Sequence, residues 1–232
     1  MSGRVYGIGV GPGDPELLSL KGLRLLRAAA VVAYPAPQDG DSFARAIVAG
    51  FLSPRQIELP IRVPMVPERF PAQEVYDRAA VDLAGHLAAG RDVAVLCQGD
   101  PFFYGSFMYL FARLAERHSV EVVPGVSSLG ACAAAAGLPL AARDDVLAIL
   151  PAPLPEDRLA ARLADAEAAA IIKLGRHYPK VRRVLGRLGL LERARYVERA
   201  SLPNERVGAL PAADAEVPYF AMVLVRKGGL GR

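Results

Sequence analysis

Hydrophobic and polar positions follow two alternating patterns along the chain, and each pattern predicts a different kind of element. Short apolar runs, such as residues 31–34 and 92–96, have the length of buried strands. Longer segments, such as residues 72–89, repeat apolar side chains every three or four positions, as amphipathic helices do. Up to residue 123 the two patterns alternate regularly, which predicts a mainly parallel sheet with helices on both faces.

The same patterns divide the chain into two lobes. Pro124 and Gly125 form the best candidate linker, so we expect an N-terminal α/β lobe at 1–123 and a C-terminal α/β lobe at 124–232, with a ligand cleft between them. The strands expected in the first lobe are 4–10, 31–34, 57–60, 92–96 and 120–123, and the helices are 15–29, 41–51, 72–89 and 106–117. The second lobe is expected to hold strands at 146–150, 169–174 and 195–199 and helices at 127–136, 156–166 and 178–188. Its last two segments, 205–210 and 219–225, are expected to be antiparallel strands paired with each other, which makes the second sheet mixed.

The turn at Gly99-Asp100-Pro101 is the most informative loop. It follows a buried strand, and Gly, Asp and Pro each favour a chain reversal for a different reason. Five aromatic residues follow within residues 102–109, although aromatic residues make up only 7% of the chain and Trp is absent. Open α/β sheets bind ligands at the carboxyl ends of their strands, so this aromatic segment predicts a flat, heterocyclic ligand. The alternative, an ordinary turn whose aromatic side chains belong to the core, stays open.

A second glycine-rich loop follows the first strand, at residues 9–14. It resembles a dinucleotide fingerprint, but Pro12 or Asp14 stands where the third glycine is required. The next strand ends at Tyr34 where an acidic ribose ligand would be expected, and no Gly-Lys-Ser/Thr of a P-loop follows. The glycines therefore predict a close approach of the backbone to another group instead of pyrophosphate binding. Asp14, followed by Pro15, is well placed to cap a helix.

Together these loops resemble those of the tetrapyrrole methylases, the S-adenosylmethionine (SAM)-dependent enzymes of corrin and sirohaem synthesis. The resemblance rests on three segments in this order: Gly9-Val10-Gly11-Pro12-Gly13-Asp14, Gly99-Asp100-Pro101 and Val123-Pro124-Gly125-Val126-Ser127-Ser128. Three further segments are similar to the precorrin-2 C20-methyltransferases of that family: the aromatic segment 102–109, Lys173-Leu174-Gly175-Arg176 and Arg199-Ala200-Ser201-Leu202-Pro203-Asn204-Glu205. The resemblance extends to the final strand and covers essentially the whole chain.

The resemblance implies a reaction and a set of contacts. The activity is transfer of a methyl group from SAM to C20 of precorrin-2, giving precorrin-3A, in cobalamin biosynthesis. The residues implied to contact SAM are Gln98, Gly99, Asp100, Phe103, Ser127, Ser128, Leu174, Ala200 and Ala221. The residues implied to contact the substrate are Pro12, Asp14, Tyr104 and Arg62, with Arg176 and Lys180 as further candidates for its carboxylates. This chain departs from relatives at Gln98, where they often carry Gly or Glu.

The catalytic groups are less defined. SAM carries its own leaving group, so no nucleophilic Ser, Cys or His is required, and the main task is to hold sulfur, methyl and acceptor carbon in line. A base must still remove the C20 proton, and Asp14 and Tyr34 are the candidates. The three histidines occupy unrelated contexts, and the chain has no run of residues with the spacing of metal ligands. Within the aromatic segment we expect Phe107 to pack inward and Tyr104 to touch the edge of the tetrapyrrole ring.

Composition narrows the class of protein. With 232 residues, 53% hydrophobic and 22% charged, the chain has the composition of a soluble globular protein, and its start does not have the pattern of a signal peptide. The uncharged stretch 122–142 is interrupted by Pro and Gly, which argues against a membrane span. Cys97 and Cys132 lack a pairing pattern, as expected in a reducing cytoplasm. A net charge of +4 suits an acidic partner, and the alternation of Arg with Glu argues against nucleic acid.

The quaternary structure and the substrate complete these expectations. We expect a cytoplasmic homodimer, because the family resembled is dimeric and the Ala-rich stretch 122–142 needs a cover. The nearest alternative activity is the same C20 methylation of cobalt-precorrin-2, and a methylase acting at another ring carbon is disfavoured by the residues after Gly99. A non-catalytic tetrapyrrole carrier would bind the ring without SAM. A nicotinamide oxidoreductase is disfavoured by the failed fingerprint.

Overall fold

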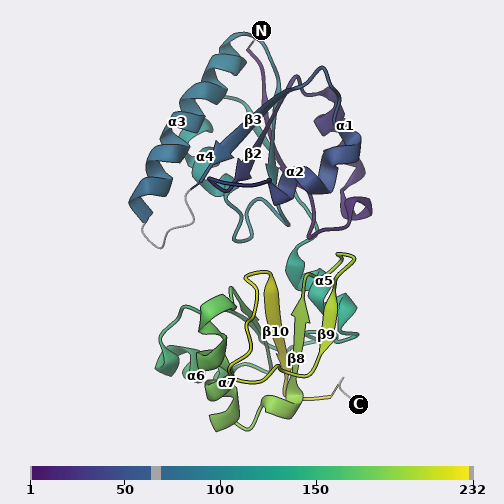
Figure 1. The fold of residues 1–232 in the computed structure, drawn as a ribbon, viewed down its shortest axis with the longest axis vertical. Coiled ribbons are helices and arrows are strands. Elements are labelled where there is room, and N and C mark those ends of the chain that lie inside the picture. Colours follow the sequence, from purple (N-terminus) through teal and green to yellow (C-terminus); the bar gives the residue numbers. More distant parts are fainter. Residues whose placement is uncertain (1, 64–68, 230–232) are drawn as a thin grey trace. The chain divides into compact units, whose positions relative to one another are not determined.

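Two five-stranded sheets organise the chain, one in each of two structural units (Figure 1). The structure is a computed structural model that describes residues 2–63 and 69–229. The units are Met1–Ser127 and Ser128–Arg232, so the division lies a few residues after Pro124 and Gly125, the predicted linker. Each unit has its own sheet, helices and apolar core. The prediction of an α/β fold with two lobes is confirmed.

The sheet of the first unit is entirely parallel. Its strands are β1 (Val5–Gly9), β2 (Val31–Ala36), β3 (Ile57–Arg62), β4 (Val93–Cys97) and β5 (Val120–Val123). They lie in the order β3-β2-β4-β1-β5. The central strands are buried along their whole length, which explains why their sequences are continuous apolar runs instead of alternating ones. The predicted parallel sheet is confirmed.

Helices cover both faces of this sheet, as expected. They are α1 (Leu20–Ala28), α2 (Phe43–Val48), α3 (Arg69–Ala88) and α4 (Phe107–Leu114). Successive side chains of β4 point to opposite faces: Val93 and Val95 pack with α3 and α4, whereas Ala94 and Leu96 pack with α1 and α2. The two faces therefore form separate apolar cores on either side of one sheet.

The helix after β1 begins later than the sequence pattern predicts. Residues Pro15–Leu17 form a short 3-10 turn, η1, and α1 starts only at Leu20. Ser19 is the reason, because its hydroxyl accepts the N–H of Gly22 at 3.1 Å and so makes a better helix cap than a continuing turn. The other 3-10 turns are η2 (Ala49–Phe51), η3 (Gly175–His177) and η4 (Leu191–Arg193). The remaining predicted elements occur with their ends shifted by a few residues.

The second unit has a mixed sheet, as predicted. Its strands are β6 (Leu147–Pro151), β7 (Ala168–Ile172), β8 (Ala194–Glu198), β9 (Arg206–Gly208) and β10 (Ala221–Arg226), in the order β6-β7-β10-β8-β9. β6 and β7 are parallel, and every other pair is antiparallel. The prediction that the last two strands pair with each other is wrong, because β8 lies between them. β10 is buried throughout and takes a central place, whereas the short, exposed β9 takes the edge.

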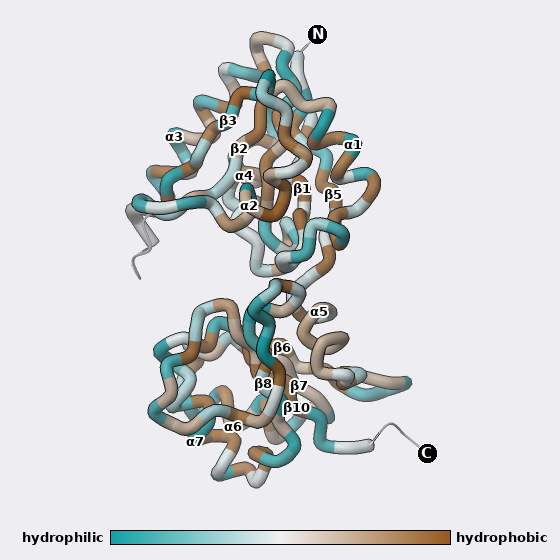
Figure 2. Tube along the Cα trace, turned by 45° about the vertical axis from the view of Figure 1, so that its right-hand side comes forward, coloured by the Kyte–Doolittle hydropathy of each residue, from teal (hydrophilic) through white to brown (hydrophobic). Residues whose placement is uncertain are grey.

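Three helices cover this second sheet. α6 (Glu156–Asp165) and α7 (Tyr178–Arg187) pack on one face, and α5 (Ser128–Ala135) packs on the other, against Ala170, Val197 and Leu224. Helix α5 is pale brown along its length, the colour of mildly hydrophobic residues (Figure 2). Among the described residues, no helix combines the length and the apolar character that a bilayer span requires.

Candidate active site

The carboxyl edge of the first sheet is where its two glycine-rich loops meet. β1 and β4 are neighbouring parallel strands, but the chain leaves β1 for α1 on one face and leaves β4 for α4 on the other. Neighbouring strands whose following helices lie on opposite faces form a topological switch point, the usual ligand position in open α/β sheets. The loops after these strands are residues 10–14 and 98–106. Both loops identified from the sequence therefore lie at the switch point.

Backbone hydrogen bonds join these two loops. The Gly99 N–H donates to the Gly11 carbonyl at 2.8 Å, and the Gly11 N–H donates to the Gly99 carbonyl at 3.3 Å. Both residues have positive φ, +81° at Gly11 and +66° at Gly99, which glycine adopts at little cost. This bridge fixes the two loops against each other at the carboxyl edge.

A third segment, which leaves β5, crosses the same point. A Cβ built on Gly125 would lie 2.1 Å from the Gly99 carbonyl oxygen, and one built on Gly9 would lie 2.6 Å from the Gly125 Cα. Because these neighbours are backbone atoms, a side chain at either position requires the backbone to move. The close approach that the glycine pattern predicts is thus, at Gly9, an approach to the protein's own backbone.

The carboxylate of Asp100 holds this crossing together. Its Oδ1 accepts the N–H groups of Phe102 and Phe103, at 2.9 and 3.1 Å, and its Oδ2 accepts the Gly125 N–H at 3.0 Å. Hydrogen bonds to an ionised carboxylate are stronger than those between neutral groups. Asp100 therefore shapes the loop that carries the predicted SAM contacts around Gly99.

The aromatic segment after this turn divides into core and rim. Phe107 is buried and packs with Phe102 and Phe111, each with ring centroids 6.3 Å away, so its predicted inward packing is confirmed. Tyr104 is 46% exposed, and its ring lies nearly perpendicular to that of Phe103, with centroids 5.2 Å apart. Tyr104 also has a φ of +55°, which is costly for a residue with a Cβ. Such outliers cluster at functional sites, which supports a role for this side chain.

Tyr34, one of the two candidate bases, takes part in a structural network. Its hydroxyl donates to Glu58 Oε2 at 2.8 Å, and the Glu58 carboxylate also accepts two hydrogen bonds from the Arg45 guanidinium, at 2.6 and 2.8 Å. Burial, followed by the hydrogen bond to Glu58, raises the pKa of Tyr34. A hydroxyl with a raised pKa is a poor proton acceptor near neutral pH, so the geometry argues against Tyr34 as the base.

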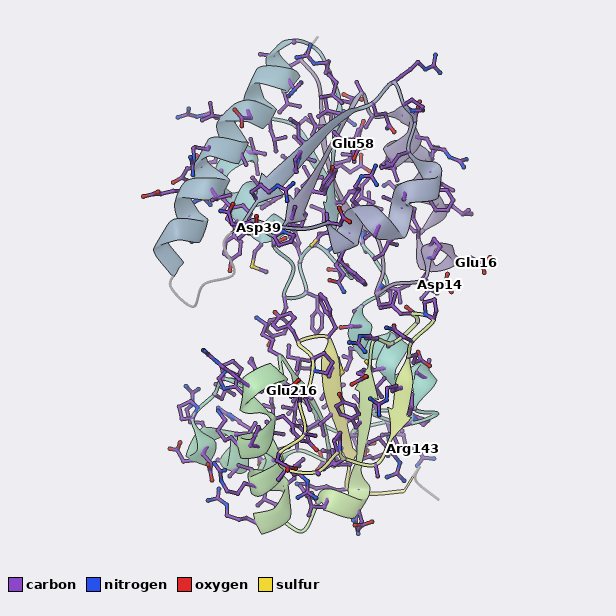
Figure 3. The ribbon with its side chains drawn as sticks, viewed as in Figure 1. Asp14, Glu16, Asp39, Glu58, Arg143 and Glu216 are labelled. Carbon is purple, nitrogen blue, oxygen red and sulfur yellow. The ribbon has the colours of Figure 1, made fainter. Side chains whose placement is uncertain are left out.

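The loop after β1 carries Pro12 and Asp14, both predicted near the substrate. Asp14 Oδ1 accepts the Glu16 N–H at 2.8 Å and so caps η1, which confirms its expected capping role. Asp14 and Glu16 lie together beside the turn that precedes α1, away from Glu58 on the sheet (Figure 3). The roles of Pro12 and Asp14 toward a substrate stay predictions.

Arg62 ends β3 and holds the loop that follows β2. Its Nη1 donates to the carbonyl oxygens of Pro37, at 2.8 Å, and Gly40, at 2.9 Å. A guanidinium has five N–H donors, and Arg62 is exposed, so this loop uses only part of its capacity. Arg176 lies in η3, and Lys180 in α7 donates to a backbone carbonyl. Their contacts with substrate carboxylates stay predictions.

The edge of the second sheet gathers the predicted SAM contacts of the second unit. β7 and β8 both run antiparallel to β10, so their carboxyl ends and the start of β10 lie at the same edge. Leu174 follows β7, Ala200 follows β8 and Ala221 begins β10, and all three are buried. Ser127 ends the first unit, and Ser128 begins α5, which contacts β8 and β10.

Strained backbone is concentrated at this second edge. Lys173, Arg199 and Ser201 have φ values of +60°, +52° and +67°, and they flank Leu174 and Ala200. Left-handed conformations cost roughly 1–2 kcal/mol for a residue with a Cβ, and they persist where the surrounding structure enforces them. The geometry thus indicates functional loops at 173–175 and 199–201, independently of sequence motifs.

Acidic side chains hold the second of these loops. The Ser201 N–H donates to Glu205 Oε2 at 2.7 Å, four residues further along the chain. Glu198, directly before Arg199, is only 4% exposed and accepts the hydroxyl of Tyr196. Burial, followed by that hydrogen bond, raises the pKa of Tyr196, so its hydroxyl remains a donor to Glu198.

Comparison with known proteins decides the family. The family model for tetrapyrrole (corrin/porphyrin) methylases matches residues 4–216, which include the carboxyl edge of the first sheet and the carboxyl ends of β7 and β8. The chain belongs to the tetrapyrrole methylases. Within the described part of this methylase, no group of three or more His, Cys, Asp and Glu residues is arranged to hold a metal ion.

Individual relatives of this tetrapyrrole methylase share most of its length. A precorrin-2 C(20)-methyltransferase from a Sinorhizobium species is 47% identical, over 96% of this chain and 95% of the relative. A cobalt-precorrin-2 C(20)-methyltransferase from Salmonella typhimurium is 29% identical, over 98% of both chains. Among solved structures, a uroporphyrin-III C-methyl transferase from Thermus thermophilus complexed with S-adenyl homocysteine is 30% identical, with a TM-score of 0.71, over 97% of this chain and 92% of that one.

Several features of this methylase escape the sequence pattern. The hydrogen bond from Gly125 to Asp100 joins distant segments, and left-handed φ at Lys173 or Ser201 leaves no compositional trace. Glu205 carried the one available signal, because a carboxylate a few residues after a turn can accept a backbone N–H of that turn. These features all act on the loops that also carry the predicted contacts.

Proposed function

We propose that this protein transfers a methyl group from SAM to C20 of precorrin-2, giving precorrin-3A, in cobalamin biosynthesis. The observation that carries the proposal is the 47% identity, over nearly the full length of both chains, to a relative named for this reaction. Membership of a methylase family favours an enzyme over a non-catalytic carrier and over a nicotinamide oxidoreductase.

The residues at the two sheet edges fit SAM as the methyl donor. Ala200 and Ala221 are small, and Gly99 has no side chain, so a ligand can approach the backbone closely at these positions. Loops held in strained or glycine-dependent conformations are pre-organised for such contacts. When bound, SAM supplies an activated methyl group on its sulfonium sulfur. The structural neighbour from Thermus thermophilus, crystallised with S-adenyl homocysteine, supports this choice.

The proposed contacts keep the set expected from the sequence. SAM is contacted by Gln98, Gly99, Asp100, Phe103, Ser127, Ser128, Leu174, Ala200 and Ala221, and the substrate by Pro12, Asp14, Tyr104 and Arg62. The hydrogen bonds of Asp100 support its part in this set. Its carboxylate accepts the N–H groups of Phe102 and Phe103 and so helps to position the Phe103 ring. The chain's contribution to rate is then orientation and exclusion of water.

The transfer requires one proton to leave the substrate. The new C–C bond forms at C20 as the S–CH₃ bond breaks, the sulfur keeps the bonding electron pair, and the C20 proton passes to a base. Asp14 is the candidate that remains, because the Tyr34 hydroxyl donates to Glu58 and has a raised pKa. A carboxylate has about four acceptor positions, so the cap on η1 is compatible with uptake of a proton by Asp14.

The metal state of the substrate distinguishes the two closest activities. The relative named for metal-free precorrin-2 is 47% identical, whereas the Salmonella relative named for cobalt-precorrin-2 is 29% identical. The difference favours the metal-free substrate. Cobalt-precorrin-2 is the second candidate, since that relative also aligns over 98% of this chain.

A cytoplasmic homodimer completes the proposal. α5 belongs to the uncharged Ala-rich stretch, and Cys132 is its one buried residue, which leaves apolar surface for a partner copy to cover. Sedimentation at micromolar concentration is expected to give twice the chain mass of 24.7 kDa. A species of the single chain mass alone would overturn the dimer.

The function is tested with carbon-13 methyl SAM and either metal-free or cobalt-loaded precorrin-2, followed by NMR of the product. We expect the label at C20 and faster turnover of the metal-free ring. Label at another ring carbon, or no transfer to either ring, would refute the assignment. Faster turnover of the cobalt-loaded ring would instead select the second candidate.

A further inference from the structure

Two arginines share one buried carboxylate at the carboxyl end of β8. Glu198 Oε1 lies 3.2 Å from Arg199 Nη1 and 3.5 Å from Arg206 Nη1. The other oxygen, Oε2, accepts the Tyr196 hydroxyl. Arg206 begins β9 directly opposite Glu198 in the antiparallel register, so strand pairing places these two residues, and Arg199 directly follows Glu198 in the turn after β8.

The charges of this cluster do not balance. One carboxylate faces two guanidinium groups, which leaves a net charge of about +1 at full ionisation. Glu205, the next acidic residue along the chain, accepts the Ser201 N–H. Across residues 2–63 and 69–229, Glu198 is the one carboxylate that forms an ion pair with either arginine. One arginine would suffice to neutralise a buried carboxylate, so the second guanidinium requires another explanation.

The unused donors of both arginines reach solvent. The side chains of Arg199 and Arg206 are 39% and 77% exposed, whereas that of Glu198 is 4% exposed. Each guanidinium has five N–H donors, more than one carboxylate oxygen can accept, and Nη1 of each lies nearest to Glu198 Oε1. The buried carboxylate therefore pairs with two guanidinium groups whose side chains remain partly open to solvent.

The cluster lies at the edge that holds the predicted cofactor contacts. Arg199 is in the left-handed conformation directly before Ala200, and Ala221 is paired with Glu198 in the sheet register. Arginine is suited to bind carboxylates because its planar fork matches their two oxygens. The chemistry of the cluster therefore fits an anionic ligand with a carboxylate, bound at the carboxyl end of β8.

We propose that Arg199 and Arg206 bind a ligand carboxylate and that Glu198 is the positioning residue for both. This inference rests on the proposed function, which supplies two sources of that carboxylate: the acidic side chains of the tetrapyrrole and the amino-acid part of SAM. Binding of either source would balance the charge of the cluster.

The test uses Arg206→Gln in the full chain, with Arg195→Gln as the matched control. Arg195 lies on the neighbouring strand β8 and loses the same charge on substitution, and its guanidinium donates to the backbone carbonyls of Glu192 and Ala194. Three quantities are measured for each folded variant: KM for precorrin-2, and the Kd values of S-adenosyl homocysteine and of 5′-methylthioadenosine, which lacks the carboxylate. Thermal melts verify folding.

We expect Arg206→Gln to weaken the binding of one carboxylate-bearing ligand roughly tenfold. Arg195→Gln is expected to leave all three quantities unchanged. A raised KM with unchanged Kd values assigns the tetrapyrrole carboxylate. A raised Kd for S-adenosyl homocysteine, with that of methylthioadenosine unchanged, assigns the carboxylate of SAM. Arg206→Lys, which keeps the charge and loses the fork, is expected to recover part of the loss.

Two results would overturn the inference. One is that Arg206→Gln changes none of the three quantities. The other is that the Kd of 5′-methylthioadenosine rises as much as that of S-adenosyl homocysteine. Equal rises show distortion of the neighbouring loop instead of a lost carboxylate contact. Failure of the wild type to methylate precorrin-2 refutes the proposed function alone, since the two Kd measurements still test the carboxylate site.

Discussion

At the edge of the first sheet three backbone segments meet with no side chain between them, whereas at the edge of the second sheet side chains hold strained turns in place. The first edge depends on Gly9 and Gly125, where a Cβ would collide with backbone, and on Gly99, which has a φ of +66° and bridges to Gly11. The second edge depends on Glu198 and Glu205, whose carboxylates accept or pair with groups of the neighbouring turn.

The difference teaches that a binding edge can be made rigid in two ways, which respond differently to added and to removed side-chain atoms. Close backbone contact fails when any atom is added, because the neighbouring backbone has no freedom to move aside. A turn held by carboxylates fails when atoms are removed, because N–H groups of the turn then lose their acceptor. Substitutions that add and that remove atoms therefore separate the two edges.

Gly125→Ala is expected to have the largest effect. Its Cβ would lie 2.1 Å from the Gly99 carbonyl oxygen, so we expect the free energy of unfolding to fall by about 3 kcal/mol or more. Gly85→Ala is the control, because a Cβ at this position in α3 has no neighbour within 4 Å. That variant is expected to be more stable than wild type by about 0.5–1 kcal/mol. Urea denaturation followed by circular dichroism measures both; equal stability of the two variants would remove the steric basis of the comparison.

Glu205→Ala tests the second edge by removing atoms. The Ser201 N–H loses its acceptor, and we expect about 1–2 kcal/mol lower stability together with weaker binding of S-adenosyl homocysteine. Exposed Glu192 in η4 provides the control, since Glu192→Ala removes the same charge from the same unit. Denaturation and calorimetric titration are the measurements. If a folded Glu205→Ala protein binds S-adenosyl homocysteine with the Kd of wild type, the Glu205 carboxylate is not what holds this turn.

Tyr104 combines features of both edges, because it carries a large side chain at a backbone conformation that favours glycine. Tyr104→Gly and Tyr104→Ala both remove the ring, but only glycine relieves the φ of +55°, so we expect the Gly variant to be about 1 kcal/mol more stable than the Ala variant. Both are expected to lower C20 methylation while SAM affinity stays near that of wild type. Melting curves, titration and product NMR provide the three readouts. Undiminished turnover would make this tyrosine an ordinary packing residue.

Tyr34→Phe is expected to have the smallest effect. It removes the hydrogen bond to Glu58, which costs about 1 kcal/mol, and it leaves kcat and its pH profile unchanged if Tyr34 is not the base. Asp14→Asn is the companion variant: its side-chain oxygen still caps η1, but it no longer accepts a proton, so turnover is expected to fall. A shifted pH profile in Tyr34→Phe, with Asp14→Asn fully active, would reverse the assignment of the base.

The sequence predicts the first unit better than the second for a physical reason. Parallel strands buried on both faces are continuous apolar runs, so β1, β2 and β4 are visible in the pattern. The placement of β9 and β10 on either side of β8 is not visible, because two strands that are close in sequence can either pair directly or flank a third strand. The late start of α1 depended on Ser19, one hydroxyl that outcompetes the continuing helical pattern.

The candidate site was predictable where a loop is rich in residues that favour turns, such as Gly, Asp and Pro. Gly99-Asp100-Pro101 and the glycines of residues 9–14 mark two loops that the structure joins by a backbone bridge. The partners of Asp100 were not predictable, because the Gly125 amide comes from a distant segment. Nor was the charge cluster of Glu198, which depends on the register between β8 and β9.

The glycine crossing also has a consequence for synthesis of the chain. Gly9 emerges from the ribosome early, but its contact with Gly125 exists only after nearly the whole first unit has been made. At about 5–20 residues per second, the first strand waits on the order of ten seconds for its last partner. During that interval β1 also lacks β4 and β5, so an apolar strand stays without its two neighbours. Capture by a nascent-chain chaperone during those seconds would protect the segment that later forms the centre of the sheet.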